Sequence, residues 1–173
     1  MSVSPHDSTP AGSLAPSRQI ALLIACLLLA YAAEGIGAIA SVNAAAFYSR
    51  LAQPSWAPPP WVFGPVWTLL YTLMAVALWR VWNRPRAPVG AIILFIAQLA
   101  VNAAWSWLFF RWHLGTLAFG WIVLLLALIL ATLAAFWSVQ RAAALLLVPY
   151  LGWVVFATAL SWAIWRANPA ALG

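Results

Sequence analysis

Five long apolar stretches dominate the chain, and short polar or proline-rich segments separate them. They predict helices at about 18–41, 61–82, 88–110, 115–137 and 142–165. Each stretch is long enough to cross the ~30 Å hydrocarbon core of a bilayer at about 1.5 Å per residue. The turns between the last four are short, so successive helices are expected to be antiparallel neighbours. The pattern therefore predicts an all-α membrane protein, a bundle of five transmembrane helices.

The five-helix domain is expected to occupy residues 18–168, with a short C-terminal tail at 169–173. Residues 1–17 are polar and rich in Ser and Pro, which predicts a disordered N-terminal tail. The first apolar stretch has a rival interpretation, a cleaved signal peptide with the Ala-Tyr-Ala at 30–32 as the cleavage site. The long region before it and the apolar residues after it favour a membrane helix.

The first long connection, residues 42–60, combines two patterns. Residues 44–51 are expected to form a short interfacial helix with Asn43 as its N-cap. The proline-rich part at 54–60 follows, and it is expected to be stiff and extended because proline fixes φ and lacks an N–H. Pro60 is expected to begin the next helix, where its missing donor is no loss.

Composition agrees with a protein dissolved in lipid. Of its 173 residues, 66% are hydrophobic and only 6% are charged, whereas soluble domains carry about 25% charged residues. All eight basic residues are arginines, and they stand mostly at the ends of apolar stretches, as membrane anchors do. Without a clustered basic patch, nucleic-acid binding is not indicated. A lone cysteine, Cys26, excludes a disulfide framework within one chain.

The arginines also predict an orientation. An odd number of spans places the two termini on opposite sides of the membrane. The arginines expected on the N-terminal side are Arg18, Arg80, Arg84, Arg86 and Arg141, against Arg50, Arg111 and Arg166 on the other. The positive-inside rule then favours a cytoplasmic N-terminus with the proline-rich connection facing outward.

Three of the predicted helices carry aromatic and polar residues at spacings of three and four, which place them on one helical face. These faces consist of Trp67, Tyr71 and Met74; Gln98, Asn102, Trp105 and Phe109; and Pro149, Trp153, Phe156 or Ala157, and Leu160, with Ser161 beside the last. Amides in hydrocarbon are costly unless paired, so these faces should point into the bundle. They predict either one cavity shared by three helices or tight packing with two amides as hydrogen-bonding partners.

Two titratable residues allow alternative interpretations. Glu34 is the one acid within a predicted span, and it is either a proton or cation site or a group that reaches the interface from a helix end. His113 lies in a turn and is either a solvated side chain or a haem ligand. The chain has no Ser-His-Asp set, carboxylate pair, glycine-rich phosphate loop or Cys/His metal cluster. Metal sites and ordinary hydrolytic chemistry are therefore not expected.

Three motifs resemble the TspO/MBR family of tryptophan-rich sensory proteins and translocator proteins (peripheral-type benzodiazepine receptors). The first is FYSRL at 47–51 followed by PSWAPPPWVFGPVWTLLY at 54–71. The second motif is NAAWS at 102–106. The third is PYLGW at 149–153, which ATAL continues within the same helix. The three motifs stand in the same order as in the family. Together they span most of the predicted helical domain, and their joint occurrence is specific.

The resemblance implies a five-helix membrane protein that binds porphyrins, haem precursors, sterols and synthetic aromatic ligands beneath the first long loop. We expect a bacterial cell-envelope protein with protoporphyrin IX or haem as its ligand and no required cofactor. The residues that match the family's binding positions are Tyr48, Trp56, Pro58, Pro59, Trp67, Asn102, Trp105, Trp153 and Ala157. The sterol pattern is incomplete, because Trp162 stands at the Tyr position between Leu160 and Arg166.

Three functions follow as hypotheses. The first is a receptor or sensor for porphyrins that is linked to tetrapyrrole transport or regulation. The second, which the resemblance implies, is light- and oxygen-dependent porphyrin degradation in which Trp67 and Trp153 react. The third is a proton-coupled transporter centred on Glu34. A homodimer is also expected, since Ala100 and Ala104 form a small-xxx-small step that permits close helix approach.

Overall fold

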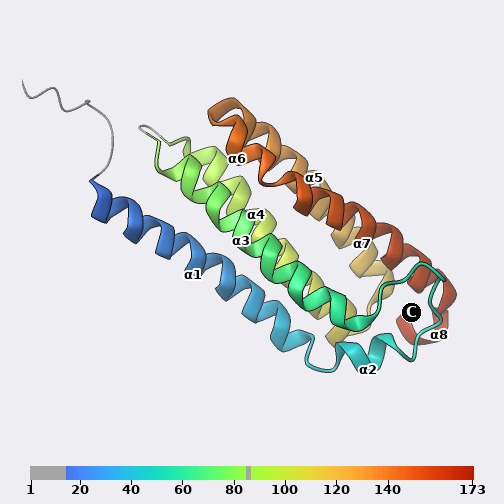
Figure 1. Ribbon diagram of the computed structural model, residues 1–173. Helices are drawn as coiled ribbons and strands as arrows, with labels where there is room; N and C mark the ends of the chain where they lie inside the picture. The colour runs from blue at the N-terminus through green and yellow to red at the C-terminus, as the bar shows by residue number, and fades with distance from the viewer. Residues whose placement is uncertain (1–14, 85–86) are drawn as a thin grey trace, which may run out of the picture.

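A computed structural model describes residues 15–84 and 87–173, and within them every regular element is a helix or a helical turn. Five helices are long and apolar enough to cross a membrane, which confirms the predicted five-helix bundle (Figure 1). The long helices are α1 Pro16–Ala40, α3 Phe63–Trp82, α4 Val89–Ser106, α5 Gly115–Val139 and α7 Val148–Ala167. The short elements are α2 Ala44–Tyr48, a 3₁₀ turn at Pro60–Val62, a π turn at Trp107–Arg111, α6 Arg141–Leu145 and α8 Pro169–Leu172.

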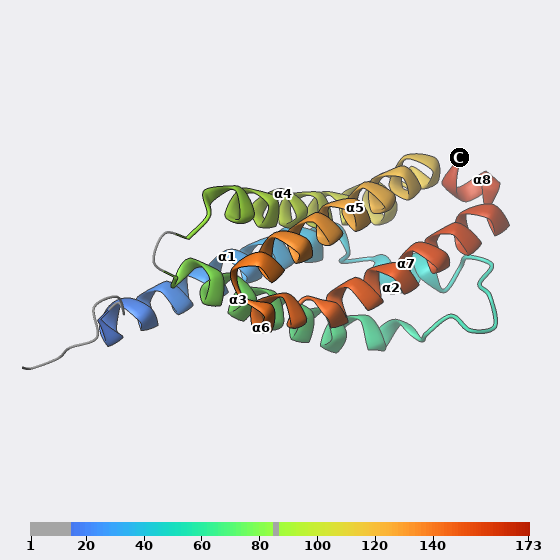
Figure 2. The ribbon, with the colours of Figure 1, turned by 90° about the horizontal axis from the view of Figure 1, so that it is seen from above.

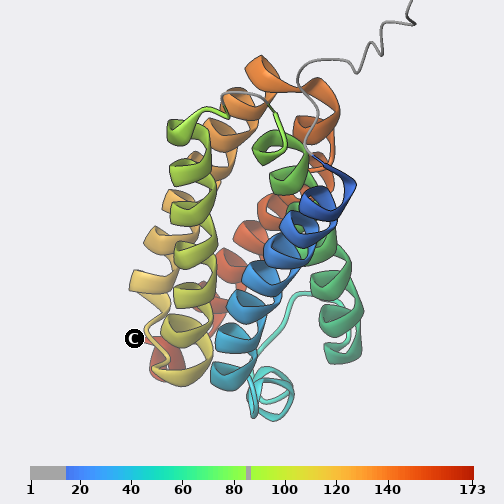
Figure 3. The same ribbon diagram turned by 90° about the vertical axis from the view of Figure 1, so that its left-hand side faces the viewer.

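The long helices form a ring around a common interior. Helix α1 packs against α3 and α4, α4 against α5, and α5 against α7, while α3 closes the ring against α6 and α7. A view turned by 90° shows α1 lying between α3 and α4, with α5 and α7 behind them (Figure 3). Helix α2, the loop at 49–59 and α8 gather at one end, opposite the start of α1 (Figures 1 and 2).

Large apolar side chains cover the outside of the bundle, and small or polar ones occupy much of its inside. Ile20, Leu28 and Val42 are each more than half exposed, as residues that contact lipid should be. Since lipid is as apolar as leucine, the helices gain association energy mainly from close packing and interior hydrogen bonds. The buried polar side chains accordingly lie within the bundle and are Gln98, Asn102, Thr132 and Ser161.

The N-terminal half departs from the prediction at two places. Helix α1 begins at Pro16, inside the predicted N-terminal tail, and residues 1–14 of that tail lie outside the described residues. Helix α2 ends at Tyr48 and does not reach Leu51. The predicted N-cap is wrong, because the Asn43 side chain makes no capping hydrogen bond. Its backbone lies at φ −101° and ψ 10°, away from the extended region that an N-cap side chain requires.

The C-terminal half also differs from the prediction. The stretch expected as one helix at 142–165 divides into α6 and α7, and Pro149 takes the second position of α7, where its missing N–H leaves no hydrogen bond unmade. The predicted C-terminal tail contains the helical turn α8. Leu172 of that turn is fully buried, and it packs beside Gly115 at the start of α5.

A π turn ends the third membrane span, which begins with α4. The N–H of Trp112 donates to the carbonyl of Trp107 at 2.9 Å, five residues back instead of the usual four. This extra residue rotates everything after Ser106 relative to an ideal α-helix. Such a rotation leaves no periodic signal in the sequence.

Gly115 provides a test of the contact between α5 and α8. A methyl group at this position would lie 2.5 Å from Trp165 Cδ1 and 2.8 Å from Leu172 Cβ. Gly115→Ala is therefore expected to cost about 1–3 kcal/mol through overpacking and to lower the midpoint of thermal unfolding, followed by tryptophan fluorescence in detergent. Gly120→Ala, on the same helix with nothing within 4 Å, is the control and should be neutral or slightly stabilising. Equal midpoints for the two variants would contradict a tight α5–α8 contact.

Candidate functional site

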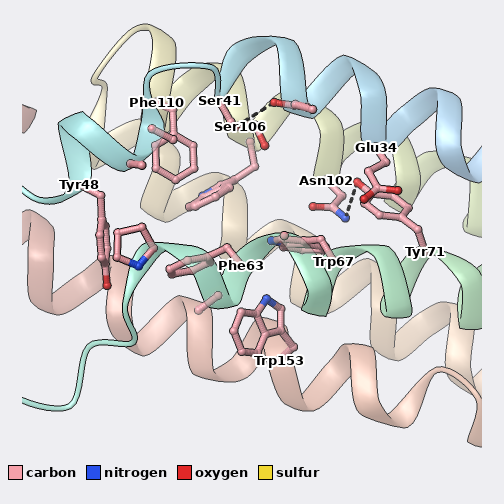
Figure 4. A pocket seen from close by; sticks show the side chains of 18 residues that line it. Glu34, Ser41, Tyr48, Phe63, Trp67, Tyr71, Asn102, Ser106, Phe110 and Trp153 are labelled. Atoms are coloured by element: carbon pink, nitrogen blue, oxygen red, sulfur yellow. Dashed lines mark hydrogen bonds between the residues drawn. The ribbon is translucent and has the colours of Figure 1, made fainter.

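A cavity of about 340 Å³ lies inside the bundle at the end where α2 and the 49–59 loop meet the helices (Figure 4). Elements α1, α2, α3, α4 and α7 all contribute to its wall. The lining residues are Glu34, Gly37, Ala38, Ser41, Ala44, Ala45, Tyr48, Pro60, Phe63, Gly64, Trp67, Tyr71, Asn102, Trp105, Ser106, Phe110, Trp153 and Ala157. The sequence left open a shared cavity or tight packing on the three inner faces, and the structure has both: a cavity at this end, with α1 and α2 as additional walls, and buried packing deeper in the bundle.

Seven of the 18 wall residues are aromatic. Phe63 meets Trp153 edge to face, with ring centroids 5.9 Å apart. Trp67 lies one turn farther along α3 and contacts Tyr71 at 5.7 Å. Rings held in this way present both faces and edges to the cavity, which suits a flat aromatic guest.

The π turn decides which phenylalanine of the third membrane span reaches the cavity. In an ideal helix Phe109, four residues after Trp105, would share its face. The extra residue brings Phe110 to the wall instead. Phe109 stacks on Trp105 with centroids 5.2 Å apart and planes at 15°, and it is buried in the core. The predicted face therefore points into the bundle as far as Phe109, but it lines the cavity only as far as Trp105.

Buried hydrogen bonds form the floor of the cavity. Asn102 Nδ2 donates to the hydroxyl of Tyr71 at 3.3 Å. One turn deeper, the Tyr150 hydroxyl donates to Gln98 Oε1 at 2.9 Å. Below this level Met74 is fully buried, and the interior is packed.

Two indole groups of the wall are unpaired. Trp105 Nε1 and Trp153 Nε1 are buried and have no hydrogen-bond partner. By contrast, the indoles of Trp79, Trp107 and Trp121 donate to backbone carbonyls at 2.9–3.2 Å. Buried donors are normally satisfied, and an unmade bond costs about 1–3 kcal/mol. Both nitrogens have almost no accessible surface in this structure, so an acceptor on a ligand would reach them only after a small movement of the neighbouring wall side chains.

The 49–59 loop joins two residues of the cavity wall, Tyr48 and Pro60, and a few polar contacts hold it in place. The Tyr48 hydroxyl donates to the carbonyl of Pro58 at 3.2 Å, and burial raises the pKa of this hydroxyl above its usual value. The Gln53 amide donates to the Tyr48 carbonyl. Asn168, after the end of α7, accepts from the Ala52 N–H at 2.8 Å and donates to the Ala52 carbonyl at 2.9 Å.

Six of the nine residues predicted to bind ligand lie on the cavity wall, namely Tyr48, Trp67, Asn102, Trp105, Trp153 and Ala157. The other three belong to the loop. Trp56 is half exposed and meets Phe156 edge to face at 5.8 Å. Pro58 accepts the Tyr48 hydrogen bond, and Pro59 is exposed just before the 3₁₀ turn. Ligand contact by any of the nine stays a prediction.

Sequence reasoning missed several wall residues. Phe63 stands four residues before Trp67, so the spacing rule already used for Trp67 and Tyr71 identifies it. Ser41, the C-cap residue of α1, follows Glu34 by seven residues, a spacing of two helical turns. No spacing in the sequence identifies Phe110, because it reaches the wall only through the π turn.

Pro149, expected on the inner face of the fifth span, is exposed.

The two titratable candidates differ in position. Glu34 lines the cavity and accepts a hydrogen bond from Thr68 Oγ1 at 3.0 Å. His113 is exposed and stacks on Phe47 with centroids 4.1 Å apart, outside the cavity wall. Within residues 15–84 and 87–173 no three His, Cys, Asp or Glu side chains gather to hold a metal ion.

Two further predictions concern the outer surface. Ala100 is exposed on α4 and Ala104 is partly buried, so the homodimer stays a prediction. Trp162 is 45% exposed with the Arg166 guanidinium 5.5 Å from its ring centroid, so sterol binding there also stays a prediction.

The comparisons with known proteins agree with this architecture. The model of the TspO/MBR family matches residues 22–166, well over half of the chain. The chain belongs to the TspO/MBR family. The resemblance predicted from three motifs is thereby confirmed, and with five apolar helices this TspO/MBR chain is an integral membrane protein.

Relatives of this TspO/MBR chain come from distant organisms. Tryptophan-rich protein TspO of Chlorobaculum tepidum is 40% identical over 158 residues, covering 88% of this chain and 99% of that protein. Protein CrtK of Rhodobacter capsulatus is 39% identical, covering 85% and 93%. The human translocator protein is 39% identical over 133 residues, covering 70% of this chain and 75% of that protein.

The contact between Asn168 and the loop can be tested by proteolysis. Asn168→Ala removes both hydrogen bonds to Ala52, so the loop should open more often and trypsin should cleave faster after the exposed Arg50. We expect several-fold faster cleavage at this bond, since two bonds of about 1 kcal/mol each are lost. Asn43→Ala, an exposed amide without a capping bond, is the control. Unchanged cleavage in Asn168→Ala would show that these bonds do not hold the loop closed.

Proposed function

We propose that this TspO/MBR protein is a membrane receptor for flat aromatic ligands, with protoporphyrin IX or haem as the ligand class. A sensor or translocator role fits the names of its relatives, among them the human translocator protein and the tryptophan-rich sensory protein of Cereibacter sphaeroides. The observation that carries the proposal is the pair of unpaired indole donors, Trp105 and Trp153, in an aromatic cavity.

The chemistry of the ligand matches that of the wall. A porphyrin is a planar π system, and aromatic side chains bind such a system by face and edge contacts. Its propionates are acceptors, and a charged acceptor strengthens the hydrogen bond that an indole N–H makes. A site with mostly apolar walls and a few convergent donors is typical of small-molecule binding.

The size of the cavity adds a condition to the proposal. A volume of about 340 Å³ is near the lower end of the roughly 300–1,000 Å³ found for small-molecule sites. It fits a compact aromatic molecule or one edge of a tetrapyrrole. A whole macrocycle therefore requires outward movement of the 49–59 loop, which only a few polar contacts hold in place.

The depth of the cavity favours a receptor over a transporter. The wall ends at Asn102 and Tyr71, and below them Met74 and Leu78 are fully buried. A ligand in this cavity meets packed side chains in the other half of the bundle. Transport across the membrane would require these helices to separate, whereas binding requires only the loop to move.

A porphyrin titration tests the proposal. We expect Trp105→Phe and Trp153→Phe each to weaken protoporphyrin IX binding about fivefold, because each removes one hydrogen bond of about 1 kcal/mol while retaining an aromatic ring. The shift of the porphyrin Soret band in detergent measures the affinity. Trp137→Phe, an exposed indole on α5 outside the cavity, is the control. If the double variant bound protoporphyrin as tightly as the parent, the indole donors would have no part in binding.

A second candidate function is light-dependent porphyrin degradation. The observation that favours it is that Trp67 and Trp153 line the same cavity, so both indoles would lie against a bound tetrapyrrole. In this reaction an indole reacts with the photo-excited macrocycle, and O₂ is the oxidant.

Illumination separates the two functions. If the protein degrades porphyrin, the Soret band of bound protoporphyrin should decay in light and O₂ but persist in the dark or under argon. Replacing both Trp67 and Trp153 by Phe should slow this decay at least tenfold at saturating protein, while Trp137→Phe leaves it unchanged. Decay at the parent rate in the double variant would exclude these side chains as reagents.

A further inference from the structure

Glu34 lies on the cavity wall, but its side chain has no role in the porphyrin binding proposed above. It lies six residues before the end of α1, about 9 Å along the axis at 1.5 Å per residue. Its carboxylate points into the cavity toward Tyr71 and Asn102 (Figure 4). Thr68 Oγ1 donates to one carboxylate oxygen at 3.0 Å, which fixes the direction of the side chain.

The carboxylate has no counter-charge in the cavity. Among the residues that the structure describes, no arginine or histidine lies on the cavity wall, and Glu34 is the one acidic residue. An ionised carboxylate at this depth in a bilayer is expensive unless a cation pairs with it. A hydroxyl from Thr68 satisfies part of its hydrogen-bonding capacity but supplies no charge.

Aromatic faces surround the same place. Trp67 and Tyr71, on either side of Thr68 in the sequence, line the cavity from α3, and Trp105 lines it from α4. A cation near an aromatic face gains about 0.5–1 kcal/mol at exposed sites and about 2 or more where water is excluded. A carboxylate with aromatic rings around it is therefore a site for an organic cation whose body is apolar.

We propose that Glu34 makes this cavity a receptor site for hydrophobic organic cations, that is, aromatic molecules that carry a protonated amine. The ammonium group pairs with the Glu34 carboxylate, and the apolar body lies among the tryptophans. This proposal uses the cavity of the proposed function but a different side chain and a different ligand class. A porphyrin bound through its propionates to the indoles does not depend on it.

The test compares three probes of nearly equal shape and different charge: 2-naphthylmethylamine, 2-naphthylmethanol and 2-naphthoate. The full chain is reconstituted in phosphatidylcholine nanodiscs, so that no anionic lipid attracts the amine, and binding is measured by calorimetry at pH 7 with empty nanodiscs subtracted. The parent should bind the amine at least tenfold more tightly than the alcohol and the carboxylate least tightly.

Glu34→Gln is the decisive variant. Its amide oxygen accepts the same Thr68 hydrogen bond, so the fold is preserved while the charge is removed. We expect amine binding to weaken about tenfold, as for the loss of one partly desolvated charge interaction, while alcohol binding changes less than twofold. Ser41→Ala, which removes a polar group from the same wall without changing its charge, is the matched control and should keep the preference for the amine.

Two results would overturn the proposal: equal binding of amine and alcohol by the parent, or unchanged amine binding in Glu34→Gln. A protoporphyrin titration of the same Glu34→Gln sample distinguishes this failure from that of the proposed function. If the protein bound protoporphyrin but the parent showed no preference for the amine, the cation site would be wrong and the proposed porphyrin function would stand. Loss of porphyrin binding in Trp105→Phe/Trp153→Phe with the amine preference intact supports the cation site independently.

Discussion

The arrangement of the bundle depends on two amides that the bilayer cannot satisfy. Gln98 and Asn102 are one turn apart on α4, and each finds its partner on a different helix, Tyr150 on α7 and Tyr71 on α3. Because an unpaired amide in hydrocarbon is costly, these bonds fix the rotation of α4 against both neighbours. They also set the level at which tight packing ends and the cavity begins.

At the cavity end of the bundle, stiff elements of the backbone keep the helices in place although their side chains are not closely packed. Prolines stiffen the 49–59 loop without needing internal hydrogen bonds, so a few contacts with Tyr48 and Asn168 are enough to place it. The π turn widens the end of the third membrane span and turns Phe110 inward. The stiff loop and the π turn thus border the cavity while leaving its interior open.

The sequence predicted those parts of the structure that depend on local pattern. Apolar stretches gave the five spans, and spacings of three and four placed Trp67, Asn102 and Trp153 on inner faces, where the cavity lies. The rest arises from contacts that no local window contains. Asn168 and Ala52 are 116 residues apart, α8 is helical because Leu172 fits beside Gly115, and Phe110 reaches the wall through a change of helical pitch.

Residues 172 and 173 pack against the start of α5. Leu172 is fully buried, and the Gly173 carbonyl accepts a hydrogen bond from Thr116 at 2.9 Å. A purification tag or fluorescent fusion attached after Gly173 would pull on this turn and, through Asn168, on the loop above the cavity. Labels for binding studies are better attached before α1, which begins at the opposite end of the bundle (Figure 1).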